Sequence, residues 1–204
     1  MRLIIASNNE HKVREIRQIL GSFFTDMATL KEAGLNIEVV EDGATFEENA
    51  LKKAAEILAA CPAFDAALAD DSGLIVDALG GAPGVYSARY AGEGHDDGAN
   101  NEKLLYELRS TPKAQRGARF ASSVALLRRY REPLCFTGFC EGEILFEPRG
   151  ENGFGYDPLF YYPPLQKSFA ELNATEKNAV SHRHASLMML KDALENECEN
   201  WSLF

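Results

Sequence analysis

Hydrophobic residues near the N-terminus change from a continuous run to a helical spacing. Leu3 to Ala6 form a short apolar run, which predicts a buried strand. Beyond a polar stretch, apolar residues return on one face of a predicted helix: Val13, Ile16, Ile19 and Leu20. Gly21 predicts the end of that helix. The polar stretch supplies its cap: Ser7 and Glu10 have capping-box spacing, and Asn8 or Asn9 are alternatives.

A second strand and a second helix follow. The strand is predicted near 36–40, and Thr45 begins another capping box with Glu48. The helix, from about Phe46 to Ala60, carries an apolar stripe of Phe46, Ala50, Ala54, Ile57 and Leu58. Lys53 falls inside this stripe and Asn49 on its edge.

The remaining pattern mixes strands and helices. A strand at 66–69 ends in Asp70-Asp71, and the following Ser-Gly pair is interpreted as a turn. Loops are predicted at 80–84 and 150–155, helices at 97–108 and 183–194, and two adjacent antiparallel strands at 118–127 and 134–146. The sequence therefore predicts a single α/β domain over residues 1–204, with part of its sheet antiparallel.

Composition narrows the class of protein. The net charge is −10 and 46% of the 204 residues are hydrophobic, so a sizeable core can form. An acidic chain argues against a nucleic-acid scaffold, although a divalent cation can still bring in a small anionic ligand. The four cysteines have no Cys-x-x-Cys spacing, which favours reduced thiols in the cytoplasm. No segment reaches the apolar length that a membrane span needs.

The acid pair raises the main chemical question. Asp70 and Asp71 repel each other at the end of an apolar run, and a bound Mg²⁺ would relieve that repulsion. Neighbours on a strand point to opposite faces, so one acid could hold metal and activate water while the other supports the turn. Both could equally be solvated loop acids.

Candidate anion-binding residues flank the predicted helices. Ser7, Asn8 and Asn9 lie at a helix N-terminus, with Lys12 in its first turn, which suits phosphate. Ordinary capping explains the same residues. Lys53, on an apolar face, either snorkels to water or meets a charge such as phosphate or a carboxylate.

Two later stretches suit the recognition of a base. Gly153 to Pro158 surrounds two aromatic residues and an acid with flexible backbone, and such aromatics stack on bases or fill a core. Residues 176–178 and 181–184 gather four basic side chains before and at the start of the last predicted helix. P-loop and nucleophile-elbow motifs are absent from the sequence, which ranks covalent serine chemistry low.

Taken in order, five stretches resemble the inosine triphosphate pyrophosphatase family: IIASNNEHKVREI, EDGATFEENALKKA, ADDSGLIVDALGGAPGVYSARYAG, GFGYDPLF and EKNAVSHRHA. They run from residue 4 to residue 185, nearly the whole chain. The resemblance implies Mg²⁺-dependent hydrolysis of non-standard purine nucleoside triphosphates (ITP, dITP, XTP) to the monophosphate and pyrophosphate. It also implies a homodimer whose long central mixed sheet, flanked by helices, carries two lobes with a cleft between them.

The resemblance also implies roles for individual residues. Asp71 would be the general base and a metal ligand, with Glu41 as a second metal ligand. Substrate-binding residues would be Ser7, Asn8, Asn9, Glu10, His11, Lys12, Ser72, Phe154, Gly155, Tyr156, Asp157, Lys177, His182 and Arg183. Lys53 is predicted to bind substrate on physical grounds, because its positive charge would offset the negative charge of the phosphates. The chain departs from the family pattern at His11, where the family often has glycine, and at Val40, where it often has an acid.

Three other functions remain open. A nucleotide sensor would bind the same ligand without turnover, and a phosphatase would release orthophosphate instead of pyrophosphate. An RNA-binding module is disfavoured by the acidic composition.

Overall fold

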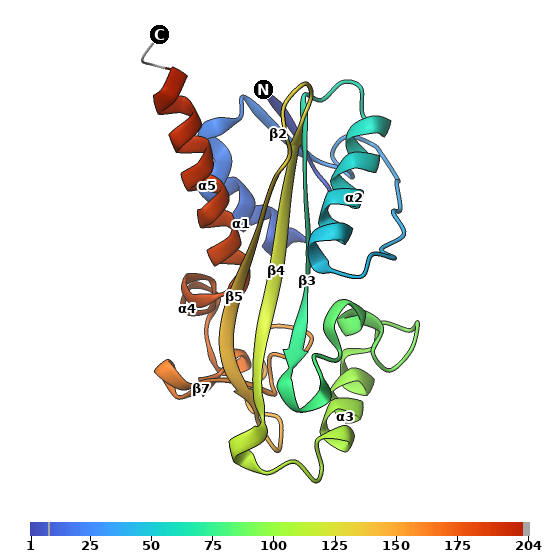
Figure 1. Ribbon diagram of the computed structural model, residues 1–204, viewed down its shortest axis with the longest axis vertical. Coiled ribbons are helices and arrows are strands. Elements are labelled where there is room, and N and C mark those ends of the chain that lie inside the picture. The colour runs from blue at the N-terminus through green and yellow to red at the C-terminus, as the bar shows by residue number, and fades with distance from the viewer. Residues whose placement is uncertain (8, 202–204) are drawn as a thin grey trace. The chain divides into compact units, whose positions relative to one another are not determined.

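The computed structural model describes residues 1–7 and 9–201 (Figure 1), so Asn8 lies outside the described residues. Seven strands form one sheet in the order β2-β1-β3-β4-β5-β6-β7. Their bounds are β1 Arg2–Ile5, β2 Asp26–Thr29, β3 Ala66–Val76, β4 Gly117–Arg128, β5 Leu134–Ile144, β6 Phe160–Tyr162 and β7 Lys167–Ser168.

Five α-helices accompany the sheet in the described part of the chain: α1 Glu10–Leu20, α2 Phe46–Ala60, α3 Asp97–Glu107, α4 Ala174–Val180 and α5 His182–Trp201. Short 3₁₀ helices cover Gly21–Phe23, Asp77–Leu79, Gly84–Arg89, Lys113–Gln115, Pro163–Leu165 and Phe169–Glu171. None of the described helices is long and apolar enough to cross a membrane.

The sheet is mixed, as the sequence predicted. β1 pairs in parallel with β2 and with β3, with Leu3 opposite Met27 on one side and Ala66 on the other. At the other edge β6 runs antiparallel to both β5 and β7. The predicted α/β class is therefore confirmed.

The second predicted strand is wrong. Residues 36–40 form no strand, and the place beside β1 is taken by β2, Asp26–Thr29. The alternation around Ile37 and Val39 is real, because both side chains pack against the core beside α2. They do so from a segment without assigned secondary structure, and Val40 is exposed.

The Ser72-Gly73 turn is also wrong, because β3 continues through both residues to Val76. Glycine is needed here for close approach. A Cβ at Gly73 would lie 2.4 Å from Ser87 Oγ and 2.6 Å from the Gly84 carbonyl oxygen. The Ser87 hydroxyl in turn accepts a hydrogen bond from the Leu74 amide at 2.8 Å.

The last helix was predicted to begin near residue 183, with a basic cluster just before and at its start. α5 does begin at His182, but residues 174–180 form a separate short helix, α4. Asn173 caps α4 with a capping box: its Oδ1 accepts from the Glu176 amide, and Glu176 accepts from the Asn173 amide. Lys177 therefore lies on α4, and not on the helix that carries Arg183.

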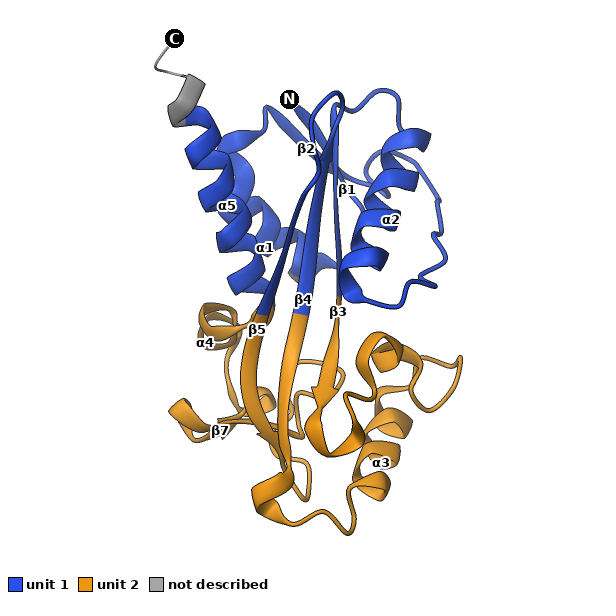
Figure 2. Cartoon of the chain, viewed as in Figure 1, with its two compact units in different colours: residues 1–71, 122–138, 183–204 blue, residues 72–121, 139–182 orange. Residues whose placement is uncertain are grey.

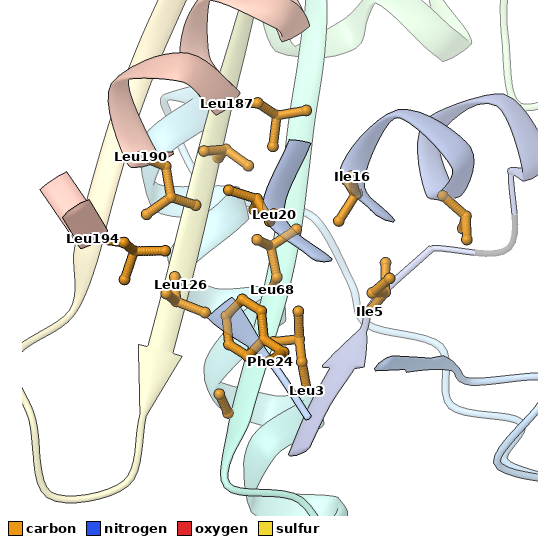
Figure 3. Close-up of a cluster of buried hydrophobic side chains, with 13 residues drawn as sticks. Leu3, Ile5, Ile16, Leu20, Phe24, Leu68, Leu126, Leu187, Leu190 and Leu194 are labelled. Carbon is orange, nitrogen blue, oxygen red and sulfur yellow. The ribbon is translucent and has the colours of Figure 1, made fainter. Parts of the chain in front are cut away.

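The chain divides into two compact units (Figure 2). Unit 1 comprises residues 1–71, 122–138 and 183–204. In it α1 and α5 pack against one face of the strands through Leu3, Leu68, Leu126, Leu187 and Leu190 (Figure 3). The opposite face packs on α2 through Ile4, Ala67, Ala69, Ala54 and Ile57.

Unit 2 comprises residues 72–121 and 139–182. Aromatic rings dominate its core: Phe120 lies 4.6 Å from Phe160 and 5.7 Å from Phe169, measured between ring centroids. Leu74, Leu104 and Leu159 complete the cluster with no exposed surface.

Candidate functional site

The predicted site residues fall into two groups, one in each unit. Unit 1 holds Glu41, Lys53, Asp71 and Arg183, together with Ser7 and Asn9 of the first loop and residues 10–12 at the start of α1. Unit 2 holds Ser72, Lys177, His182 and the loop 154–157.

Asp70 is the centre of a buried ion network in unit 1. Its Oδ2 accepts from Lys12 Nζ at 2.8 Å and from Arg183 Nε at 3.3 Å. The Asp70 side chain is 2% exposed, and those of Lys12 and Arg183 are 19% and 9% exposed. One carboxylate therefore joins the helix after the first loop to the first turn of α5.

Burial and charge act in opposite directions on this network. Burial alone would raise the pKa of Asp70, but the positive charges of Lys12 and Arg183 outweigh it and hold that pKa below the usual value. For Lys12, burial lowers the pKa, and the nearby charges of Arg183 and Lys53 act in the same direction against the attraction of Asp70. Asp70 is therefore ionised at neutral pH.

Asp71 points to the other face of the strand, toward α2. Its Oδ2 accepts a hydrogen bond from Asn49 Nδ2 at 2.9 Å. The same Asn49 side chain, only 1% exposed, accepts from the Gly43 amide through Oδ1 at 2.7 Å. A buried amide thus connects Asp71 to the turn before α2.

Lys53 lies one helical turn beyond Asn49 on the same face of α2. Its ammonium forms an ion pair with Glu41 and lies 3.3 Å from the Asp70 carbonyl oxygen. The side chain is 20% exposed, so Lys53 meets charged and polar partners at the end of the apolar stripe. The sequence left snorkelling and a charge partner open, and the second of these is confirmed.

The first loop caps α1 with Asn9. Asn9 Oδ1 accepts from the Lys12 amide and Ser7 Oγ accepts from the Asn9 amide, each at 3.2 Å. One of the predicted caps is thereby confirmed. Glu10 begins α1 and is exposed, and His11 lies in the same first turn.

In unit 2, Asp157 organises the glycine-rich loop. Its carboxylate is buried, forms an ion pair with Lys177 and accepts from the Phe154 amide at 2.9 Å. Lys177 Nζ also lies 4.7 Å from the centroid of the Phe154 ring, within cation–π range. Phe154 itself is 48% exposed, which leaves ring surface for a stacked ligand.

Hydrogen bonds to α3 and to Ser87 hold the rest of this loop in place. The Gly155 amide donates to Asp97 at 2.7 Å, and its carbonyl accepts from Asn101 at 2.9 Å. Tyr156 is buried and donates its hydroxyl to the Ser87 carbonyl at 2.8 Å. Burial raises the pKa of Tyr156 well above its usual value. Ser72, also in unit 2, is half-buried.

His182 packs against the aromatic core of unit 2. Its ring stacks on Phe120 with centroids 4.9 Å apart and an interplanar angle of 17°. It is 7% exposed and begins α5. The stacking and burial confirm the structural role that the sequence left open, and the ligand-binding role of His182 stays a prediction.

The donor chemistry of unit 1 fits a hard divalent cation. Asp71 and Glu41 offer carboxylate oxygens, which Mg²⁺ prefers. Among the described residues no group of three or more acidic, histidine or cysteine side chains could hold a metal. Mg²⁺ often binds through one or two carboxylates together with substrate phosphates. Two protein carboxylates would therefore be enough ligands for Mg²⁺ when the substrate is bound.

Sequence reasoning did not assign functional partners to Asp70, Asn49, Asp97 or Asn101. A signal existed for the first two. Asp70 and Asp71 must face opposite sides of a continuous strand, and Asn49 precedes Lys53 by one helical turn. Asp97 and Asn101 carry no such signal, because their contacts with Gly155 join residues more than 50 positions apart.

Comparison with known proteins finds relatives over nearly the whole chain. A sequence profile of the Ham1 family matches residues 3–193. A dITP/XTP pyrophosphatase of Leuconostoc mesenteroides is 51% identical over 93% of this chain and 94% of its own length. One from Clostridium perfringens is 49% identical over 95% and 97%. The Ham1 protein of Staphylococcus aureus has a TM-score of 0.86 at 42% identity, covering 97% of this chain and all of its own.

Proposed function

Because the chain belongs to the Ham1 family, we propose that it is a nucleoside triphosphate pyrophosphatase acting on dITP, XTP and ITP. The products are the nucleoside monophosphate and pyrophosphate. The observation that carries the proposal is the concentration of Lys12, Lys53 and Arg183 around the acid pair at residues 70 and 71. Such a site pairs cations for phosphate with a carboxylate for proton transfer.

The unit 1 group receives the triphosphate in this proposal. Lys12 and the first-loop residues Ser7 to His11 bind its oxygens at the start of α1, where free amides favour an anion. Lys53 offers a second ammonium from α2. The ion pair of Lys12 with Asp70 is only partly screened from solvent, so the lysine can reach a phosphate oxygen while staying near Asp70.

Asp71 is the general base. Its carboxylate accepts the proton of the water that attacks the α-phosphorus, and pyrophosphate leaves with the electron pair of the broken P–O bond. An aspartate of ordinary pKa, about 4, is a weak base, so this step needs an acidified water. Mg²⁺, held by Asp71 and Glu41, would supply that acidification and neutralise phosphate charge.

The unit 2 group receives the purine. Phe154 stacks on the base, and Gly155, Tyr156, Asp157 and Ser72 shape its surroundings. Lys177 and His182 offer hydrogen-bond donors, which match the 6-oxo group of hypoxanthine and xanthine. Adenine presents an amino group there, and each buried donor left unpaired costs about 1–3 kcal/mol.

One product assay tests the proposal. The protein is incubated with ITP, dITP, XTP or ATP and Mg²⁺, and pyrophosphate and orthophosphate are measured separately. We expect pyrophosphate from the first three and little from ATP. Asp71→Asn should abolish release while ITP binding persists, and Asp192→Asn, an exposed acid on α5, is the matched control.

The same assay separates the rival functions. Orthophosphate as the product would indicate a phosphatase. Binding of ITP without any product would indicate a nucleotide sensor, and Asp71→Asn would then change little.

We further propose that the enzyme works in the cytoplasm as a homodimer. All four cysteines are free thiols, which suits a reducing compartment. The dimer rests on the resemblance to the inosine triphosphate pyrophosphatase family, and the molar mass in solution tests it.

A further inference from the structure

Asn49 has a position that capping and core packing do not explain. It is the fourth residue of α2 after the cap Thr45, and asparagine is a poorer helix former than alanine. Its side chain is 1% exposed, so both ends of the amide need partners inside the protein. Those partners are Gly43, in the turn before the helix, and Asp71, on β3.

The orientation of the amide is determined by Gly43. A backbone N–H can only donate, so the end of Asn49 that faces it must be the carbonyl oxygen. The opposite end, Nδ2, then faces Asp71 Oδ2 and donates to it. Asn49 therefore presents a fixed donor to one oxygen of Asp71.

Gly43 has no room for a side chain. A Cβ there would lie 2.7 Å from Asn49 Oδ1 and 2.9 Å from Glu48 Cβ. The neighbouring Ala44 amide donates to Glu48 at 2.7 Å, which anchors the turn to the first turn of α2. Absence of a side chain at Gly43 thus permits the close contact that orients Asn49.

From this chain of contacts we propose that Asn49 is a positioning residue, which holds the Asp71 carboxylate in its catalytic orientation through the Gly43 turn. The inference rests on the proposed role of Asp71 in pyrophosphate release. Asn49 does not touch substrate; it acts on the reaction only through Asp71. The same turn follows Glu41, so Asn49 also ties the segment carrying the second proposed metal ligand to β3.

Three variants probe the contact at different atoms. Asn49→Ala removes both hydrogen bonds. Asn49→Asp has nearly the same shape and keeps an acceptor for the Gly43 amide, but places a like charge opposite Asp71. Gly43→Ala leaves Asn49 in the sequence and displaces its amide by the close contact. Gly21→Ala is the matched control, because a Cβ there meets nothing within 4 Å.

The kinetic readout is pyrophosphate release from dITP with Mg²⁺, fitted for kcat and KM. For the three variants we expect kcat to fall about 10- to 100-fold, as for other residues that orient a reacting group, with KM within about threefold of wild type. Gly21→Ala should keep wild-type kcat. A loss confined to folding would instead lower the fraction of active protein, which thermal unfolding of each variant measures.

The structural readout is a crystal structure of Asn49→Asp, the variant that keeps the shape of the side chain. We expect the Asp71 carboxylate to leave its present orientation. Wild-type kcat in both Asn49→Asp and Gly43→Ala, or an unmoved Asp71 carboxylate, would overturn the proposal. If wild-type protein releases no pyrophosphate, the proposed function fails, and the crystal structure alone decides whether Asn49 positions Asp71.

Discussion

Asp70 and Asp71 are consecutive residues whose carboxylates bind partners on opposite faces of β3. Asp70 pairs with Lys12 and Arg183 beside α1 and α5, whereas Asp71 accepts from Asn49 on α2. Figure 2 shows these helices on the two sides of the strands in unit 1. The alternation of a strand thereby gives Asp70 a structural task and leaves Asp71 for its proposed role as general base.

The first prediction concerns Asp70→Asn. The substitution leaves the cations Lys12 and Arg183 largely buried without their shared carboxylate, so the free energy of unfolding should fall by about 3–5 kcal/mol. Urea denaturation at pH 7 measures it. Asp26→Asn breaks an exposed pair with Arg2 and should cost about 1 kcal/mol or less. Equal losses in the two variants would contradict the assignment.

The second prediction concerns acid unfolding at the contact of β4 with α5. Glu197 accepts two hydrogen bonds from Arg128, at 2.5 and 2.9 Å, and these bonds hold its pKa below the ordinary 4.5. Because the pKa is lower in the folded protein, the stabilisation is fully present above pH 4.5 and is lost as the pH falls below it.

Glu197→Gln should therefore be less stable than wild type at pH 7, with a difference that shrinks as the pH falls through 4. Glu195→Gln, an exposed site on the same helix, is the control. Thermal unfolding between pH 7 and pH 3 measures both. A stability difference between Glu197→Gln and wild type that stays constant with pH would show that Glu197 does not contribute to acid unfolding.

Most helices and strands could be predicted from the sequence because apolar spacing and helix caps depend on residues close together in the chain. The apolar stripe of α2 and the cap at Thr45 are both borne out, since each depends on residues within one or two turns of helix. The strand predicted at 36–40 was wrong because strand pairing is not a local property. Its alternation reflects Ile37 and Val39 packing on the core, but strand pairing depends on a distant competitor, Asp26–Thr29.

The candidate site shows the same division. Sequence alone marked Lys53 as a residue that either snorkels to water or meets a charge, and the structure pairs it with Glu41. Sequence did not assign Asp70 to Lys12 and Arg183, because those contacts join residues 58 and 113 positions apart. Long-range polar contacts leave no periodic trace in the chain, so only the folded arrangement reveals them.

The third prediction tests the role of Phe154. Stacking on an aromatic ring is worth about 1–3 kcal/mol per base, so Phe154→Ala should raise KM for ITP roughly tenfold or more while kcat changes less. Phe139→Ala is the matched control, because Phe139 is 50% exposed in the same unit. Unchanged KM in Phe154→Ala would exclude stacking by this ring.

The fourth prediction concerns Gly73, which the sequence suggested as half of a turn and which instead lies inside β3. A Cβ there would lie 2.4 Å from Ser87 Oγ, and that hydroxyl cannot withdraw easily, because it donates to the Gly84 carbonyl at 2.6 Å. Gly73→Ala should therefore lower the free energy of unfolding by about 1–3 kcal/mol, as overpacked sites do.

Urea denaturation measures the loss at Gly73, with Gly94→Ala as the control, since a Cβ at Gly94 meets nothing within 4 Å. The two variants make the same chemical change in the same unit, so their difference isolates the close approach of β3 to Ser87. If Gly73→Ala were as stable as Gly94→Ala, the strand could shift away from Ser87 at no cost. Glycine would then be dispensable at the position directly after Ser72.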